Sequence, residues 1–255
     1  MKISGKAWAK YISDLRAVND KAAADMVAFM KTIDFNTDTG RRALLDYAYA
    51  ISQKYGSAAA ELACEMYDSM GILSGMALDP AVPADLATYG EVAKAVNGTI
   101  KFSENLEEIA GSVSRLVKMA GVDTTMNNAI RDGAEWAWIP QGETCAFCIT
   151  LASRGWQPAS RKAMKGGHAE HIHANCDCTY AIRFNSGTDV QGYDPDKYYE
   201  MYKDAAPGKN SKTKINAMRR EFYAENSEKI NEQKRDAYQK QKERESSAAE
   251  ETNVN

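Results

Sequence analysis

One stretch, Cys145 to Cys178, constrains this chain more than any other. It opens with a Cys-x₂-Cys pair and closes with a cluster of histidines and cysteines. Four of the 5 cysteines and all 3 histidines of the chain lie inside it. Cys and His are the side chains best suited to zinc, and a Cys-x₂-Cys pair presents two thiolates from a single turn. The stretch therefore predicts one structural zinc site, closed by a second pair of ligands from later in the chain.

Cys145 and Cys148 form the first half of the predicted Zn²⁺ site. The other two ligands come from a His-x₂-Cys-x-Cys group, which consists of His173, Cys176 and Cys178. The residues alone do not decide which two of these three bind, and His171 and then His168 follow as candidates. Two disulfides, or thiols that bind nothing, are the alternatives. Because the N-terminus lacks the apolar core of a secretory signal, a reducing cytosol and zinc are favoured.

The same residues resemble the cysteine-rich module of phage minor head proteins. The resemblance covers about residues 135–185, in the run from Glu143 to Gly155 and in His173-Ala-Asn-Cys176-Asp-Cys178-Thr179. These proteins are relatives of the phage Mu head morphogenesis protein, and their hallmark is Cys-x₂-Cys followed by His-x₂-Cys-x-Cys. The resemblance implies a minor capsid protein that acts in head assembly near the portal. Portal or major capsid subunits would be its partners, packaged DNA a further one, and the virion head its location.

The composition is that of an ordinary soluble protein. Hydrophobic residues make up 44% of the 255 residues and charged residues 26%, which is enough for a sizeable core. The net charge of −3 gives no global attraction to nucleic acid. No apolar run approaches the roughly 20 residues that a membrane span needs. We therefore expect folding in the host cytoplasm and no membrane partner.

The first half of the chain shows the apolar spacing of amphipathic helices. The predicted helices cover residues 5–33, 41–55, 57–74, 91–96, 103–120 and 124–132. Gly56 and Gly121 are expected to end the helices that precede them, because glycine is common just past a helix C-terminus. Polar side chains of the last helix, Asn128 and Arg131 among them, are expected on a solvated face.

Strand patterns appear only around the Cys/His stretch. Glu135–Ile139 alternates with period two, and residues 179–184 follow the last cysteine directly. Paired antiparallel, the two strands would bring the halves of the metal site together. A short helix is expected near residues 148–154, and Asp194-Pro195 marks the start of another.

The sequence predicts a mainly α chain in three parts. A helical domain covers residues 1–133, a small zinc-clamped α+β module covers 134–207, and a basic helical tail covers 208–255. The tail repeats itself, since Lys214–Tyr223 recurs as Lys229–Tyr238. From residue 209 to 245 it carries eleven Lys/Arg against seven Asp/Glu. We expect it to be loose in isolation, to order against a capsid or portal subunit, and to be disordered from residue 246 onward.

Enzyme interpretations are weaker than a non-catalytic one. His168-Ala-Glu170 contains the residues of a zinc deaminase motif, but that motif precedes its Cys-x₂-Cys pair, whereas here it follows. A metal-finger nuclease has similar ingredients, but it needs a catalytic metal or base besides a structural zinc. A capsid maturation protease would need a triad around Ser153 or Ser160, and no spacing supports one. The sequence therefore predicts no enzyme, with a nuclease and then a protease as alternatives.

Overall fold

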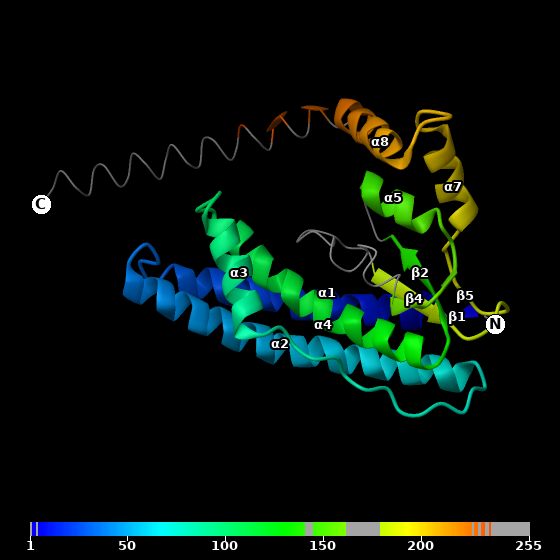
Figure 1. Cartoon of the computed structure of the whole chain (residues 1–255), viewed down its shortest axis with the longest axis horizontal. Coiled ribbons are helices and arrows are strands. Elements are labelled where there is room, and N and C mark those ends of the chain that lie inside the picture. The colour runs from blue at the N-terminus through cyan, green and yellow to red at the C-terminus, as the bar shows by residue number, and fades with distance from the viewer. Residues whose placement is uncertain are drawn as a thin grey trace, which may run out of the picture.

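The computed structural model describes residues 2–3, 5–140, 145–161, 179–225, 227–228, 231–232 and 235. Within these ranges the chain is mainly helical with two small sheets, in agreement with the predicted class. Three long helices lie side by side, and the larger sheet and a group of shorter helices lie near one end of them (Figure 1). The described residues contain no helix long and apolar enough to cross a membrane.

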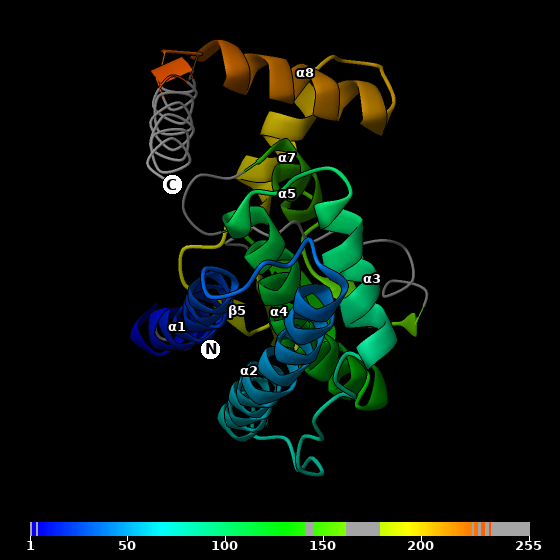
Figure 2. The same cartoon turned by 90° about the vertical axis from the view of Figure 1, so that its left-hand side faces the viewer.

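The long helices are α1 (Gly5–Met30), α2 (Asp38–Leu73) and α4 (Leu106–Arg131), and each packs against the other two. The shorter α3 (Tyr89–Ile100) packs against α2 and α4. Figure 2, which looks along the bundle, shows the four helices grouped around a common interior. The buried side chains recur at helical spacing along each helix. This part of the fold follows directly from the apolar pattern of the sequence.

Side chains define where α3 and α4 begin. Thr88 and Glu91 form a reciprocal capping box at the start of α3. The side chain of Asn105 accepts hydrogen bonds from the backbone N–H groups of Glu107 and Glu108, at 2.9 and 3.2 Å, and so begins α4. α4 then continues to Arg131, so the two helices predicted between residues 103 and 132 are one.

The prediction that Gly56 and Gly121 end helices is wrong, because α2 and α4 run straight through them. A Cβ atom on Gly121 would lie 3.1 Å from the backbone oxygen of Ala59, and one on Gly56 would lie 3.2 Å from a methyl of Leu86. Both glycines therefore permit close packing of backbone rather than a helix stop. α2 ends instead before Gly75, whose φ of +66° lies in the left-handed region.

An irregular strap, residues 76–88, follows α2 and is held by side chains of the helices. The amide side chain of Asn128 both donates to the carbonyl of Val82 and accepts from its N–H, each at 2.9 Å. The guanidinium of Arg131 donates to the carbonyls of Asp79 and Pro80. The expectation of a solvated face is therefore wrong for Asn128, which is 2% exposed. Its polar partner is the chain's own backbone.

The larger sheet has the order β3-β2-β4, with β2 (Glu135–Ile139) in the centre. β3 (Gln157–Pro158) and β4 (Thr179–Arg183) both run antiparallel to β2. The predicted pairing of the two strands that flank the Cys/His stretch is thus confirmed. Glu135 faces Arg183 in the register, and their side chains form an ion pair at 2.6 Å. The second sheet is the short parallel pair β1 (Lys2–Ile3) and β5 (Asp189–Val190).

Two hydrophobic cores divide the long helices between them. The helical core combines α3, the second half of α1 and the first halves of α2 and α4, with Met26, Leu44 and Val113 almost fully buried. The sheet-end core joins the first half of α1 and the second halves of α2 and α4 to the sheet, with Tyr67 and Trp138 almost fully buried. Hydrophobic packing is therefore continuous across residue 133. The predicted division of the chain into three parts stays a prediction.

A layer of shorter helices completes the described structure. It consists of α5 (Ala146–Ala152), α7 (Pro195–Asp204) and α8 (Ser211–Glu225), which pack against one another. Asp194 caps α7 as the sequence predicted. The expectation of a loose tail is wrong for α8, because Met218 is 7% exposed and packs with Ala146 and Ile149 of α5. Residues 236–255, with the end that was expected to be disordered, lie outside the described residues.

Candidate metal centre

The first half of the predicted zinc site is a turn at the start of α5. Cys145 is the N-cap residue of this helix, with extended backbone angles of −71° and 157°. Its Sγ accepts a hydrogen bond from the backbone N–H of Cys148 at 3.5 Å. Hydrogen bonds to a ligand sulfur fix its orientation and stabilise the thiolate that binds metal. The hydrogen bond thus ties the two cysteines of the pair together at the start of α5.

The two cysteines differ in their exposure. Cys148 is 1% exposed and belongs to the sheet-end core, whereas Cys145 is only partly buried at its edge. No disulfide joins them to each other. The fifth cysteine, Cys64, lies apart on α2, and burial raises the pKa of its thiol. Cys64 is thus a poor nucleophile or metal ligand, in line with the sequence interpretation of an inert thiol.

The sheet brings together the two ends of the Cys/His stretch. The chain leaves β2 at Ile139, pairs with one edge of β2 as β3, and pairs with the other edge as β4. β4 begins at Thr179, which is the direct partner of Ile139 in the antiparallel register. T-shaped contacts of Tyr180 with Trp136 and Trp138 hold this register, with ring centroids 5.0 and 4.7 Å apart. The strands before and after the Cys/His stretch therefore meet at one end of the β2–β4 pair, as a clamp between the two halves of the site requires.

The second half of the predicted site lies outside the described residues. This applies to His173, Cys176 and Cys178, and equally to the further candidates His168 and His171. The described residues contain no group of three or more Cys, His, Asp or Glu side chains placed to hold a metal ion. The structure thus describes Cys145 and Cys148, and the zinc site stays a prediction.

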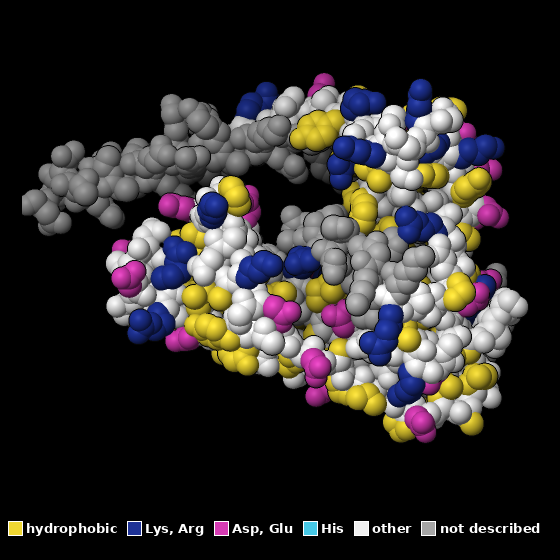
Figure 3. All heavy atoms as spheres, viewed as in Figure 1, with side chains coloured by type: hydrophobic (Ala, Val, Ile, Leu, Met, Phe, Trp, Pro, Cys, Tyr) yellow, Lys and Arg dark blue, Asp and Glu magenta, His cyan; other side chains and the backbone are white. Residues whose placement is uncertain are grey.

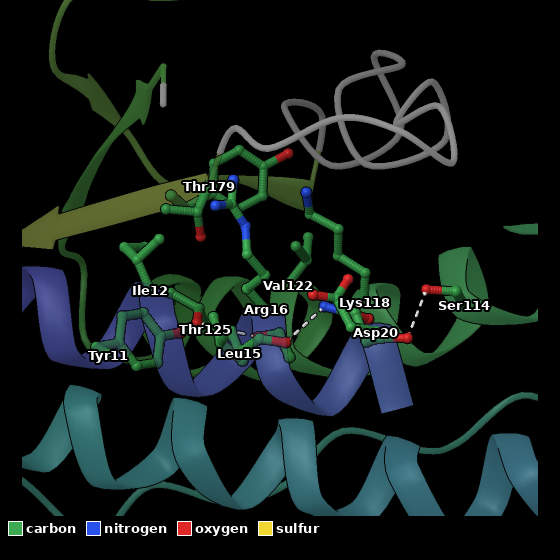
Figure 4. Close-up of a pocket in the computed structure, with 13 residues that line it drawn as sticks. Tyr11, Ile12, Leu15, Arg16, Asp20, Ser114, Lys118, Val122, Thr125 and Thr179 are labelled. Carbon is green, nitrogen blue, oxygen red and sulfur yellow. Dashed lines mark hydrogen bonds between the residues drawn. The ribbon is translucent and has the colours of Figure 1, made fainter. Parts of the chain in front are cut away.

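A small pocket of about 100 Å³ lies between α1, α4 and the start of β4 (Figure 4). Arg16 of α1 and Lys118 of α4 extend from the helices toward the β4 side of this pocket, and Thr179 lines it there. Burial raises the pKa of Tyr11 at the other side, so this hydroxyl stays protonated. The pocket thus places two cations beside the residue that directly follows Cys178.

Sequence reasoning missed these two cations and also Lys214 in α8. Lys214 is 7% exposed, and its ammonium donates to the carbonyls of Lys203, Tyr202 and Ala205, at 2.7, 3.0 and 3.2 Å. The same ammonium lies 5.1 Å from the ring centre of Tyr202. Its only signal in the sequence was its place at the start of the tail repeat. In the sequence, a lysine within a charged helix is expected to be solvated. Only the structure shows that Lys214 caps the C-terminal end of α7.

A sequence profile of the family named VG15 protein matches residues 2–205. The chain belongs to the VG15 protein family. This membership places it among phage proteins. The VG15 match takes in the helical bundle, the sheet, the Cys/His stretch and α7, and ends before α8. Neither the search of curated proteins nor the search of solved structures found a match.

Proposed function

We propose that this VG15 protein is a non-catalytic minor capsid protein that acts in head morphogenesis. It would fold in the host cytoplasm and take its place in the virion head beside portal or major capsid subunits. The observation that carries the proposal is the arrangement of the Cys/His stretch. It begins with a Cys-x₂-Cys turn, and its His-x₂-Cys-x-Cys group lies in the sequence between the paired strands β2 and β4. The family match supports the phage context.

The zinc ion in this proposal is structural. Cys145 and Cys148 would bind it from the α5 turn, and two of His173, Cys176 and Cys178 would complete the tetrahedron. Zinc held by four protein ligands contributes to folding and leaves no open position for a reacting water. The buried Cys148 and the N–H···S hydrogen bond fit this closed type of site. The site would hold the β2–β4 pair, α5 and the intervening residues as one unit.

Exposed apolar side chains at the end of α2 support a protein partner. Ile72 is 77% exposed, Leu73 51% and Met76 43%, and Val82 of the neighbouring strap is 60% exposed. A group of large apolar side chains on the surface is typical of an interaction site. The surface is otherwise mixed in charge, with Lys/Arg and Asp/Glu interspersed over the bundle on the face shown in Figure 3. Such a patch suits a capsid or portal subunit better than DNA.

Assembly with the other head proteins of the same phage tests the proposal. We expect the protein to co-purify with portal or major capsid protein and to be present in mature heads. The double variant Ile72→Ser/Val82→Ser should reduce its incorporation, while the control Phe102→Ser, at an equally exposed apolar residue elsewhere, should not. A protein that is absent from heads and cleaves DNA with added Mg²⁺ or Mn²⁺ would instead support the nuclease alternative.

A further inference from the structure

The basic and acidic residues of α8 are interspersed in the sequence but lie on different sides of the helix. Lys214, Met218, Glu221 and Glu225 share one stripe, at spacing i, i+4, i+7, i+11. Lys214 and Met218 are the buried residues of this helix. Met218, Glu221 and Glu225 line a hollow between α5, α7 and α8. The acidic residues of α8 therefore lie on the side that faces α5 and α7.

The opposite side of α8 is basic. Lys212, Asn216, Arg219 and Tyr223 form a second stripe with the same spacing, and Arg220 borders it. These five residues, which we call the basic face, include three cations and no carboxylate. Figures 1 and 2 show α8 at the outer edge of the described structure, with α5 and α7 between it and the bundle. The basic face is thus turned away from the rest of the described fold.

The three cations of the basic face, Lys212, Arg219 and Arg220, are exposed. Within the described part of the chain none of them forms an ion pair, whereas Arg131 and Arg183 pair with neighbouring carboxylates. Lys and Arg side chains also gather over α7 and α8 in the view of Figure 3. Like charges gathered on one surface attract a polyanion. The basic face therefore has the charge of a polyanion-binding surface.

We propose that the basic face binds the phosphate backbone of duplex DNA without reading its sequence. From Lys212 to Arg220 the helix rises roughly 12 Å, at 1.5 Å per residue. Duplex DNA carries one negative charge per ~1.7 Å of its axis, so a duplex alongside presents roughly seven phosphates over this length. Arg, Lys, Asn and Tyr are all residue types that contact phosphate and sugar. The cations of the face supply the affinity.

A duplex fits the basic face better than other acidic partners do. A folded protein would need several carboxylates in line, whereas a duplex offers such a line at every position. Single strands are held by aromatic side chains that stack with successive bases, and the basic face has one aromatic ring, that of Tyr223, which is 55% exposed. The family match ends at residue 205, before α8. The inference goes beyond the proposed capsid role and does not depend on it.

The salt dependence of DNA binding tests the inference. Full-length protein is titrated into a short labelled duplex of mixed sequence, and fluorescence anisotropy is recorded over a range of salt concentrations. With three phosphate contacts, the logarithm of the binding constant should fall with the logarithm of salt concentration at a slope of about −3. Arg219→Gln/Arg220→Gln should weaken binding by about tenfold or more at low salt and change the slope to about −1. Lys31→Gln/Arg42→Gln removes the same charge from two exposed residues in and just before α2, and should keep the slope near −3.

Lys212→Gln is a second, milder variant, and its slope should be about −2. A circular dichroism spectrum of each variant verifies that the helix content is retained. The inference is overturned if the protein does not bind the duplex at low salt, if the control pair weakens binding as much as the arginine pair, or if all variants have the same slope. Tighter binding to the single strand than to the duplex, or binding to polyglutamate but not to DNA, would also overturn it.

Discussion

The two ends of the helical bundle are held together in different ways. At the far end, the helical core is closed by stripes of apolar residues on four helices, and each stripe is a local property of its helix. At the other end, the same long helices pack against a sheet whose strands β2 and β4 are separated by the whole Cys/His stretch. The first core can form from the bundle alone. The second depends on closing a long loop, which is costly in entropy unless a clamp compensates for it.

The outer layer of α5, α7 and α8 differs further from both cores. Its hydrophobic cluster contains three buried residues, Ala146, Ile149 and Met218. Its specific contacts are the buried ammonium of Lys214 and the Cys145–Cys148 turn. A layer with so little buried apolar surface relies on polar contacts, and the proposed zinc would add to its stability. Stability should therefore fall from the helical core, through the sheet end, to this layer.

A cavity in the helical core should have the largest effect. Leu44→Ala removes a fully buried side chain, so we expect a loss of about 2–5 kcal/mol in the free energy of unfolding. Urea unfolding followed by circular dichroism measures it. The exposed Leu73→Ala serves as the control and should change stability little. Similar losses for both variants would contradict a core centred on Leu44.

Loss of the proposed zinc should affect the sheet end and spare the helical core. We expect Cys148→Ser, or a strong chelator, to increase hydrogen exchange in α5 and at the β2–β4 pair. Exchange in the second halves of α2 and α4 should also rise, because their side chains share the sheet-end core, but less than in α5 and the β2–β4 pair. Exchange around Leu44 and Val113 should not change. Cys64→Ser is the matched control. Uniform unfolding of the whole chain would remove the distinction between the two ends.

Lys214→Met should release α8 without affecting the rest. The variant removes an ammonium that satisfies three carbonyls at the end of α7, and buried charge-assisted hydrogen bonds contribute about 1.5–3 kcal/mol each to local stability. Limited proteolysis should then cut near residues 205–210 more rapidly. Lys212→Met, two residues away on an exposed position, should be cut at the original rate. Equal cutting of both variants would argue against the cap.

Asp123 of α4 offers a smaller, pH-dependent effect. Burial, and then the charge of Glu91, raise the pKa of its carboxyl from 3.8 to about 6. Such a group contributes stability that is present below the unfolded-state pKa and lost as the pH rises through 6. Asp123→Asn should therefore stabilise the protein by on the order of 1–2 kcal/mol at pH 7.5 and hardly at all near pH 4. Urea midpoints at both pH values measure this, and an equal gain at both would contradict it.

The parts of the fold that the sequence could predict are those set by local pattern. Helical spacing, the Glu135–Ile139 alternation and the Asp194-Pro195 start are local, and each was found where expected. The prediction failed at Gly56 and Gly121, because a glycine needed for close packing looks the same in the sequence as a glycine that ends a helix. Only the structure shows that Gly121 lies against Ala59 and Gly56 against Leu86.

The same limit applies to the site. The Cys-x₂-Cys turn and the pairing of its flanking strands were predictable from spacing and alternation. The roles of Asn128 and Lys214 were not, because both bind backbone carbonyls or N–H groups supplied by other segments of the chain. When a polar side chain binds backbone groups, the residue type at the bound position does not matter, so the sequence shows no pattern there. Tertiary structure alone reveals such contacts.

The most direct test of the account is the zinc content of the purified protein, measured with hydrogen exchange before and after chelation. We predict close to one zinc per chain, released by a strong chelator or at acid pH as the thiolates protonate. Its release should raise exchange in α5 and the β2–β4 pair while leaving the helical core protected. A protein that holds no zinc, and whose α5 and β2–β4 pair exchange at the same rate with and without chelator, would contradict the account.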